Sequence, residues 1–273
     1  MGTKLYIVGT PIGNLGDISP RALETLEKAD FIAAEDTRVT LKLLNHFGIK
    51  KEMVSYFEHN KGLKDDIIID RMLNGEVCAL VSDAGMPAIS DPGEDLVRKC
   101  RERGFGIESE PGPTADATAL AISGFSTKRF CFEGFLSVEK QERREHLEEL
   151  KNEKRTTVFY EAPHKLKATL RDMLEVWGDR EIALVKELTK IYEDVFITTL
   201  SKAIKFYEEN PPKGEFVLVI KGAIEEKEVH TLLDAVKLAK GLMEKGESAS
   251  ASAKEAAKIT GIKKGDIYKE ILN

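Results

Sequence analysis

The chain has few of the residues that build disulfide frameworks or metal centres. It contains three cysteines and five histidines in 273 residues, and no two histidines stand at the spacing of a metal-ligand pair. Cys78, Cys100 and Cys131 lie far apart in the sequence, so we expect core thiols in a reducing cytoplasm rather than disulfides. We therefore expect no bound metal and a cytoplasmic location. No apolar run approaches the roughly 20 residues of a membrane-spanning helix, and no membrane association is expected.

The chain also lacks an excess of positive charge. Its net charge of −6 argues against a protein that coats polyanions. A local basic face is still possible, because affinity for phosphates depends on where lysine and arginine cluster. The candidates for such a path are residues 128–129, 143–144 and 154–155, together with the C-terminal tail. The alternative is that these charges only solvate helices.

Short apolar runs alternate with helical patterns from the start of the chain. The runs predict strands at residues 4–8, 31–34, 53–56, 77–81 and 106–109, and alternation of this kind favours a mostly parallel sheet with covering helices. A second series predicts strands at residues 130–132, 156–160, 181–185, 195–198 and 216–220. After Gly222 the pattern becomes helical, and the segments on either side of Gly261 resemble a helix-turn-helix. We predict two α/β domains, at 1–114 and 115–224, and a small helical tail at 225–273.

The loop at residues 82–93 is the most informative stretch of the chain. It has the sequence SDAGMPAISDPG and follows a strand-like run. Proline fixes φ and glycine permits positive φ, so this composition predicts a loop of defined shape. Connections between strands and helices usually have only about 2–6 residues, and longer ones are usually functional. A long, shaped loop at the carboxyl end of a buried strand is where open α/β sheets bind ligands.

Three further loops are expected at the same edge of the sheet. They lie at residues 9–16, 35–38 and 110–115. The first is rich in glycine but lacks the Gly-Lys-Ser/Thr of a P-loop and the spacing of a dinucleotide fingerprint. Glycine backbone, small side chains and few fixed positive charges suit a neutral or zwitterionic small ligand better than a triphosphate.

Charged side chains near that edge are the candidates for chemistry. Glu35, Asp36 and Arg38 form the densest ionic cluster, and either contact a substrate or form an ion pair that shapes a turn. His59 follows the third strand, and it has either a capping role or a catalytic one. Glu187 ends a strand of the second domain beside Lys186 and is expected to face the cleft between the domains. No nucleophile stands in an elbow motif.

Taken together, these loops resemble the tetrapyrrole methylase superfamily, whose members use S-adenosylmethionine. Within it, the chain is most similar to the bacterial enzymes that methylate the ribose 2′-hydroxyl of a 16S ribosomal RNA cytidine. The motifs that carry the resemblance are GTPIGNLGDI at 9–18, AEDTR at 34–38, SY at 55–56, HN at 59–60, VSDAGMPAISDPG at 81–93, PGPTA at 111–115, FYEAPH at 159–164, KELTK at 186–190 and GEFVLVI at 214–220. The departures are modest: the family usually has Thr at Met86, Ser at Thr114 and Arg at Lys165.

The resemblance implies two α/β domains with S-adenosylmethionine between them, a homodimer, and 16S rRNA within the small ribosomal subunit as the partner. Residues in matching positions imply a cofactor site of Pro11, Ala84, Gly85, Met86, Ile89, Thr114, Ala115, Tyr160 and Leu188. Transfer of a methyl group to a hydroxyl is assisted by a base. The candidates for catalysis are Glu35, Asp36, His59 and Glu187, with Arg38, Lys186 and Lys190 available to orient phosphate or to stabilise a developing alkoxide.

Two other functions remain open at this point. The first is methylation of a small molecule of the tetrapyrrole type, because the superfamily contains such enzymes. The second is a nucleic-acid-binding regulator, which depends only on the helix-turn-helix-like tail and leaves the four loops unexplained.

Overall fold

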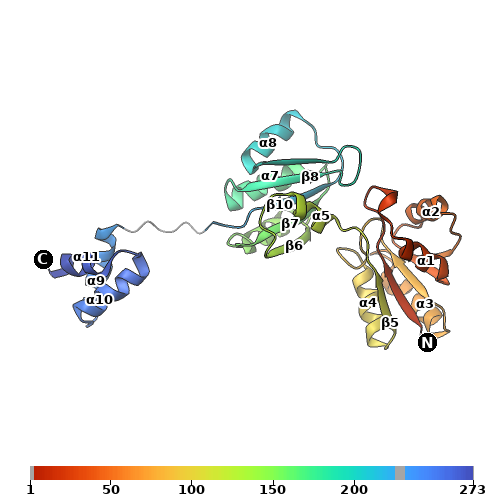
Figure 1. Ribbon diagram of the computed structural model, residues 1–273, viewed down its shortest axis with the longest axis horizontal. Coiled ribbons are helices and arrows are strands. Elements are labelled where there is room, and N and C mark those ends of the chain that lie inside the picture. Colours follow the sequence, from red (N-terminus) through yellow and green to blue (C-terminus); the bar gives the residue numbers. More distant parts are fainter. Residues whose placement is uncertain (1–2, 225–230, 273) are drawn as a thin grey trace. The chain divides into compact units, whose positions relative to one another are not determined.

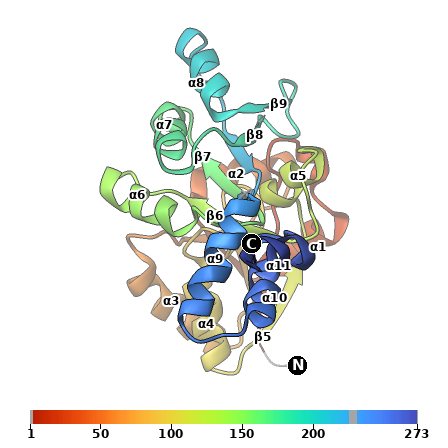
Figure 2. The same cartoon turned by 90° about the vertical axis from the view of Figure 1, so that its left-hand side faces the viewer.

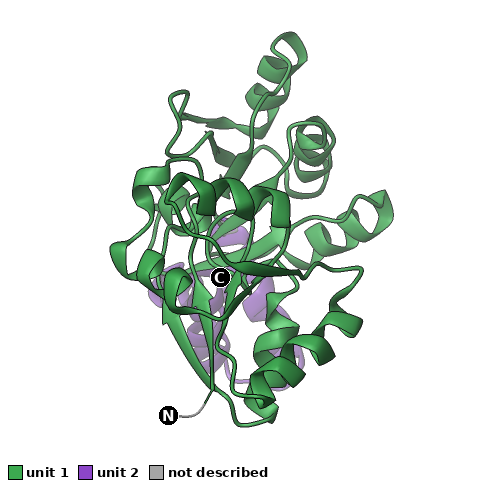
Figure 3. Ribbon diagram, turned by 90° about the vertical axis from the view of Figure 1, so that its right-hand side faces the viewer, with its two compact units in different colours: residues 1–223 green, residues 224–273 purple. Residues whose placement is uncertain are grey.

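The computed structural model describes residues 3–224 and 231–272. The chain divides into two compact units, residues 1–223 and residues 224–273, coloured separately in Figure 3. The first unit contains two five-stranded sheets (Figure 1). The expected domain boundary at 114/115 falls between these sheets and stays a prediction. The start of the predicted tail, at 225–230, lies outside the described residues.

The first sheet is entirely parallel, with the strand order β3-β2-β4-β1-β5. Its central strands β2 and β4 are buried at every residue, as expected for apolar strands covered on both faces. The elements are β1 (Lys4–Val8), α1 (Pro20–Lys28), β2 (Phe31–Ala34), α2 (Thr37–His46), β3 (Glu52–Ser55), α3 (Lys61–Leu73), β4 (Cys78–Val81), α4 (Gly93–Glu102) and β5 (Gly106–Glu110), with a 3-10 turn at Leu15–Asp17. The predicted parallel sheet is confirmed, with strand ends within one residue of those expected.

Alternate residues of these strands fill two apolar layers, because successive side chains of a strand point to opposite faces. Leu5 and Ile7 pack on one face with Phe31, whereas Val8 packs on the other with Ile32. The sheet is therefore fixed from both sides, and the loops at its carboxyl ends project from a rigid base.

The second sheet is mixed, with the order β6-β7-β10-β8-β9. Only β6 and β7 are parallel; β10 is antiparallel to β7 and β8, and β8 is antiparallel to β9. Seven residues separate β8 from β9, too few for the crossover that a parallel pair needs. The elements are α5 (Ala115–Ile122), β6 (Phe130–Phe135), α6 (Lys140–Glu149), β7 (Thr156–Glu161), α7 (Leu166–Trp177), β8 (Glu181–Lys186), β9 (Asp194–Thr199), α8 (Leu200–Glu209) and β10 (Phe216–Ile220).

The charged stretch around α6 corrects one sequence-based expectation. Arg143 is only 7% exposed, and its Nε donates to Asp172 Oδ2 at 2.8 Å. Two further hydrogen bonds join its Nη1 to backbone carbonyls. Arg143 therefore holds α6 against α7, and its assignment to an RNA-binding path is wrong. Arg144 and Arg155 are each paired with a glutamate, and the role of the remaining residues of that path stays a prediction.

The second unit consists of three helices, α9 (Leu232–Glu244), α10 (Ala249–Thr260) and α11 (Lys264–Leu272), shown in blue in Figure 2. A capping box of Thr231 and Asp234 begins α9, and Gly261 ends α10 in the left-handed conformation. Small side chains such as Ala239 and Ala256 form its core around Ile267. Across the described parts of both units, no helix combines the length and apolar character needed to cross a membrane.

Candidate active site

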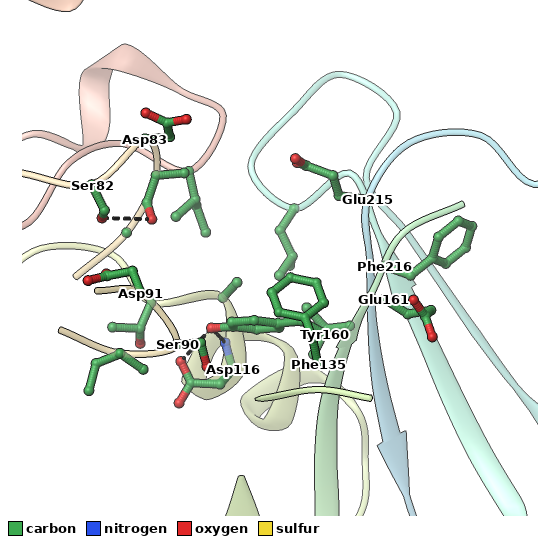
Figure 4. Close-up of a pocket in the computed structure, with 18 of the residues that line it drawn as sticks. Ser82, Asp83, Ser90, Asp91, Asp116, Phe135, Tyr160, Glu161, Glu215 and Phe216 are labelled. Atoms are coloured by element: carbon green, nitrogen blue, oxygen red, sulfur yellow. Dashed lines mark hydrogen bonds between the residues drawn. The ribbon is translucent and has the colours of Figure 1, made fainter. Parts of the chain in front are cut away.

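A cavity of about 530 Å³ lies in the first unit, between the loops of the first sheet and the second sheet. This volume falls within the roughly 300–1,000 Å³ typical of small-molecule sites. Figure 4 shows Ser82, Asp83 and Asp91 on one side of it, and Tyr160 and Phe135 on the other. Its wall is formed by Ile12, Glu35, Ser82, Asp83, Ala84, Gly85, Met86, Ile89, Ser90, Asp91, Thr114, Ala115, Asp116, Phe135, Tyr160, Glu161, Ala162, Pro163, Val185, Leu188, Glu215, Phe216 and Val217.

The loops after β1, β4 and β5 are tied to one another through their backbones. Thr10 and Gly85 exchange hydrogen bonds of 2.9 and 3.1 Å, and the Gly9 amide donates to the Glu110 carbonyl at 2.9 Å. A Cβ on Gly9 would stand 2.6 Å from the Cα of Gly112, a distance that real Cβ atoms do not reach. Glycine at these positions lets three loops converge on one wall of the cavity.

The loop at residues 82–92 is held in a strained conformation. Ala88 and Ser90 have φ values of 67° and 61°, although neither is glycine. The Asp91 carboxylate accepts the amides of Ala88 at 2.9 Å and Gly93 at 2.7 Å and so pins the loop. Positive φ at such residues costs on the order of 1–3 kcal/mol and is concentrated at functional sites.

A second strained loop faces the cavity from the other sheet. Glu187 and Thr189, between β8 and β9, have φ values of 52° and 64°, and Leu188 between them lines the cavity. The Glu187 carboxylate accepts Lys190 Nζ at 3.0 Å and the Glu215 amide at 3.2 Å. The hydrogen bond from Lys190 lowers the pKa of Glu187. This carboxylate is therefore occupied in shaping the loop and is a weak base.

Glu35 and Asp83 join the loops that follow β2 and β4. Glu35 Oε2 accepts the Asp83 amide at 3.2 Å, and Asp83 Oδ1 accepts the Asp36 amide at 3.0 Å. Burial raises the pKa of Glu35 and of Asp83. The negative charges of Asp83 and Asp36 raise the pKa of Glu35 further, and that of Asp36 raises the pKa of Asp83. Both side chains line the cavity, so the pair places proton-accepting oxygens at its wall.

Asp36 and Arg38 are engaged with each other instead. Asp36 caps α2 by accepting the Arg38 amide at 2.8 Å, and its carboxylate pairs with the Arg38 guanidinium at 2.6 Å. The hydrogen bonds from Arg38 lower the pKa of Asp36 to about 2. Of the two alternatives for this cluster, the turn-shaping ion pair describes Asp36 and Arg38, whereas Glu35 faces the cavity.

The second sheet supplies an aromatic wall. The Tyr160 hydroxyl accepts the Asp116 amide at 3.2 Å and donates to Asp116 Oδ1 at 3.1 Å. Phe132 and Phe135 pack edge to face against the Tyr160 ring, with centroids 4.8 and 5.4 Å away. These contacts fix the ring of Tyr160 in the cavity wall.

The structure brings together most of the residues predicted for the cofactor. The eight that line the cavity are Ala84, Gly85, Met86, Ile89, Thr114, Ala115, Tyr160 and Leu188. Pro11 is not in the wall, but its neighbour Ile12 is. Met86 lies deep in the site, where its sulfur accepts the Gly112 amide at 3.2 Å. The binding role of these residues stays a prediction.

The catalytic candidates are more dispersed. Only Glu35 lines the cavity; Asp36, Arg38, His59 and Glu187 do not. His59 is exposed in the turn before α3, with its ring 6.4 Å from that of Phe57. Sequence reasoning missed Asp83 and Asp91 as individual residues, although it singled out their loop. It also missed Phe135, for which the glycine one position earlier in the strand was the available signal.

Residues 4–204 match the family described as tetrapyrrole (corrin/porphyrin) methylases. The chain belongs to the tetrapyrrole methylase family. Three curated relatives are named ribosomal RNA small subunit methyltransferase I. The one from Halalkalibacterium halodurans is 46% identical over 97% of this chain and 93% of its own length. The one from Escherichia coli O157:H7 is 42% identical over 98% and 94%.

The third relative, from Thermotoga maritima, is 48% identical over 219 residues, which are 80% of this chain and 98% of the relative. Its length is thus close to that of the first compact unit alone.

Solved structures of distantly related proteins share the fold. A diphthine synthase aligns with a TM-score of 0.62 at 15% identity, over 81% of this chain and 90% of its own. A uroporphyrin-III-C-methyltransferase from Thermus thermophilus aligns with a TM-score of 0.57 at 21% identity, over 80% and 94%. At these identities the likeness concerns architecture, and it confirms the predicted fold class. Within the described residues, no three potential metal ligands gather in one place.

Proposed function

We propose that this chain is an S-adenosylmethionine-dependent methyltransferase of small-subunit ribosomal RNA, and that its target is the ribose 2′-hydroxyl of a cytidine in 16S rRNA. The observation that carries the proposal is a sequence identity of 46% to a ribosomal RNA small subunit methyltransferase I over 97% of the chain. The alternative, a small tetrapyrrole-type substrate, has in its favour the description of the matching family and the shared fold of distant structures.

The cavity fits the cofactor in size and in chemistry. Its first wall includes Ala84 and Gly85, whose small size leaves space for a ligand beside the main chain. The opposite wall adds the fixed ring of Tyr160 and the apolar side chain of Leu188. A mostly apolar cavity with a few placed polar groups is typical of a small-molecule site.

When bound, S-adenosylmethionine supplies a methyl group on a positively charged sulfur. The protein's part is to hold the acceptor hydroxyl in line with it and to receive the proton. Glu35 is the best-placed acceptor, because it lines the cavity and burial raises its pKa. A carboxylate with a raised pKa is a stronger base while it remains ionised. Asp83 orients Glu35 through its amide and adds negative charge beside it.

The loops contribute by rigidity. Asp91 fixes the strained segment around Ala88, and Glu187 fixes the segment around Leu188. Both loops are thus set before a ligand arrives, which reduces the ordering cost of binding. In this proposal Glu187 is a positioning residue, Asp36 and Arg38 form the cap of α2, and His59 has no contact that supports a part in the reaction.

We also propose a homodimer in the cytoplasm, as the resemblance to the superfamily and a ribosomal substrate imply. Light scattering on the purified protein is expected to give twice the chain mass of 30.4 kDa.

The test is to incubate the purified chain with methyl-labelled S-adenosylmethionine and small ribosomal subunits that lack the modification. Label is expected in 16S rRNA at one cytidine, in a linkage that resists alkaline hydrolysis because the 2′-oxygen is blocked. Label on a base, or in a small molecule but not in RNA, would contradict the proposal.

A further inference from the structure

Phe135, the last residue of β6, is a large apolar side chain that lines the cavity and yet remains 53% exposed. It lies on the wall opposite the loop at residues 82–92 (Figure 4). Exposed aromatic rings in a groove are the platforms on which proteins stack unpaired nucleobases. The position of Phe135 therefore calls for an occupant with a flat ring.

The backbone around Phe135 is built to present this ring. The pairing of β6 with β7 shifts register between Phe132 and Gly134, which marks a bulge. Gly134 has φ +64°, and a Cβ there would stand 2.9 Å from Ser90 Oγ, so β6 abuts the strained loop of the first sheet. Tyr160, itself held by Asp116, supports the Phe135 ring at 5.4 Å.

A cation stands next to the ring. Lys165 Nζ lies 5.9 Å from the Phe135 centroid and 3.9 Å from Glu161 Oε1, at the outer limit of an ion pair. Lys165 is also the N-cap residue of α7, and its side chain makes no capping hydrogen bond there. The amino end of a twelve-residue helix beside a lysine attracts a phosphate group.

We propose that Phe135 and Lys165 form the subsite for the target nucleotide, an unstacked pyrimidine of the RNA. Its base stacks on Phe135, and its phosphate lies at Lys165 and the start of α7. The inference rests on the proposed function and adds to it the residues that receive the acceptor. The cationic Lys165 suits the negatively charged phosphodiester of RNA. The sulfonium of the cofactor is positively charged and would be repelled by it. Enzymes that modify nucleotides within folded RNA or DNA take the target out of the stack in this manner.

The test compares Phe135→Ala with Phe130→Ala in the full-length protein. Phe130 starts the same strand, is 40% exposed and is not in the cavity wall, so it is a matched control. Phe135→Ala is expected to raise the KM for small subunits on the order of 10-fold, in line with the loss of one base–aromatic stack. Its affinity for S-adenosylhomocysteine, measured by calorimetry, should fall by less than the KM for subunits rises, because Phe135 touches the cofactor wall only through its support of Tyr160. Phe130→Ala should match wild type, and Phe135→Trp should retain activity.

Lys165 provides an independent readout. Lys165→Ala is expected to reduce the slope of log KM against log salt concentration by about 0.7–0.9, the value for one phosphate contact, whereas Lys165→Arg should keep it. The inference is overturned if Phe135→Ala, with a cooperative melting transition, binds subunits as wild type does. It is also overturned if that variant loses affinity for S-adenosylhomocysteine instead. An inactive wild type would contradict the proposed function itself.

Discussion

Gly9→Ala is the substitution for which the structure gives the clearest quantitative expectation. The new methyl group would stand 2.6 Å from both Cα and N of Gly112 and 2.7 Å from Met86 Sδ. Met86 can move its flexible side chain, but the backbone of Gly112 is tied into the loop after β5. Overpacking of this kind costs about 1–3 kcal/mol, and contact with backbone on one whole side places Gly9→Ala near the upper end.

This cost has two measurable consequences. For a unit of about 220 residues, 3 kcal/mol corresponds to a fall in melting temperature of roughly 6–12 °C. The displaced loops also line the cofactor cavity. Each 1.4 kcal/mol of strain that the bound protein has in excess of the free protein is a tenfold loss of affinity. We expect the KM for S-adenosylmethionine in the small-subunit assay to rise about tenfold or more.

Gly62→Ala is the matched control. Gly62 lies in the first turn of α3, and a Cβ there would meet no atom within 4 Å. Alanine is favoured over glycine in helices by about 0.5–1 kcal/mol, so this variant should be slightly more stable with an unchanged KM. The reasoning is refuted if Gly9→Ala melts and binds the cofactor like Gly62→Ala.

Three further substitutions follow from the same structure. Glu35→Gln should lower kcat about 10²-fold or more, the usual contribution of a general base. The raised pKa of Glu35 means that folding disfavours its ionised form, so the neutral variant should not have a lower melting temperature than wild type. In wild type, kcat should fall on the acid side at a higher pH than an ordinary glutamate would give, and a kcat with no acid limb at any pH where the protein stays folded would exclude Glu35 as the base. Asp91→Ala should raise the KM for S-adenosylmethionine more than it lowers kcat. Asp91→Asn keeps an oxygen that accepts the amides of Ala88 and Gly93, so it should stay near wild type. Equal behaviour of the two variants would contradict the role of Asp91 in fixing the loop. Arg143→Ala should lower the free energy of unfolding in urea by about 3–5 kcal/mol, because it leaves the buried Asp172 carboxylate without its ionic partner. Arg144→Ala removes an exposed ion pair and should cost under about 1 kcal/mol. Similar losses in the two variants would refute this distinction.

The first sheet could be predicted almost completely from the sequence, for a physical reason. Strands buried on both faces need uninterrupted apolar residues, and 31–34 and 78–81 carry that pattern without ambiguity. Glycine and proline then mark the loops, and in a parallel sheet the carboxyl-end loops meet at one edge. The cavity wall that these loops form could therefore be predicted from the sequence.

The second wall was harder to predict. Phe135 joins the site only because a bulge at Gly134 turns β6 against a loop some 45 positions earlier, and local patterns do not record such contacts. Arg143 lay in a run of charges that is typical of a solvated helix. Its partner Asp172 is 29 positions away, so its burial depends on how α6 packs on α7.

The strain in the loops was likewise beyond sequence reasoning. Nothing in the residue types of Ala88 or Glu187 signals a positive φ, because glycine or asparagine is the usual choice there. These conformations are imposed by the hydrogen bond that Asp91 accepts from the Ala88 amide and by the one that Lys190 donates to Glu187. They are a product of tertiary structure.

The central claim is that the cavity between the two sheets holds the methyl donor. Its most direct test is calorimetric titration of the full-length protein with S-adenosylhomocysteine. We predict saturable binding with one site per chain, weakened when Leu188 or Ala84 in opposite walls is replaced by a bulky side chain. A properly folded protein that releases no heat of binding with this compound at millimolar concentration would contradict the account.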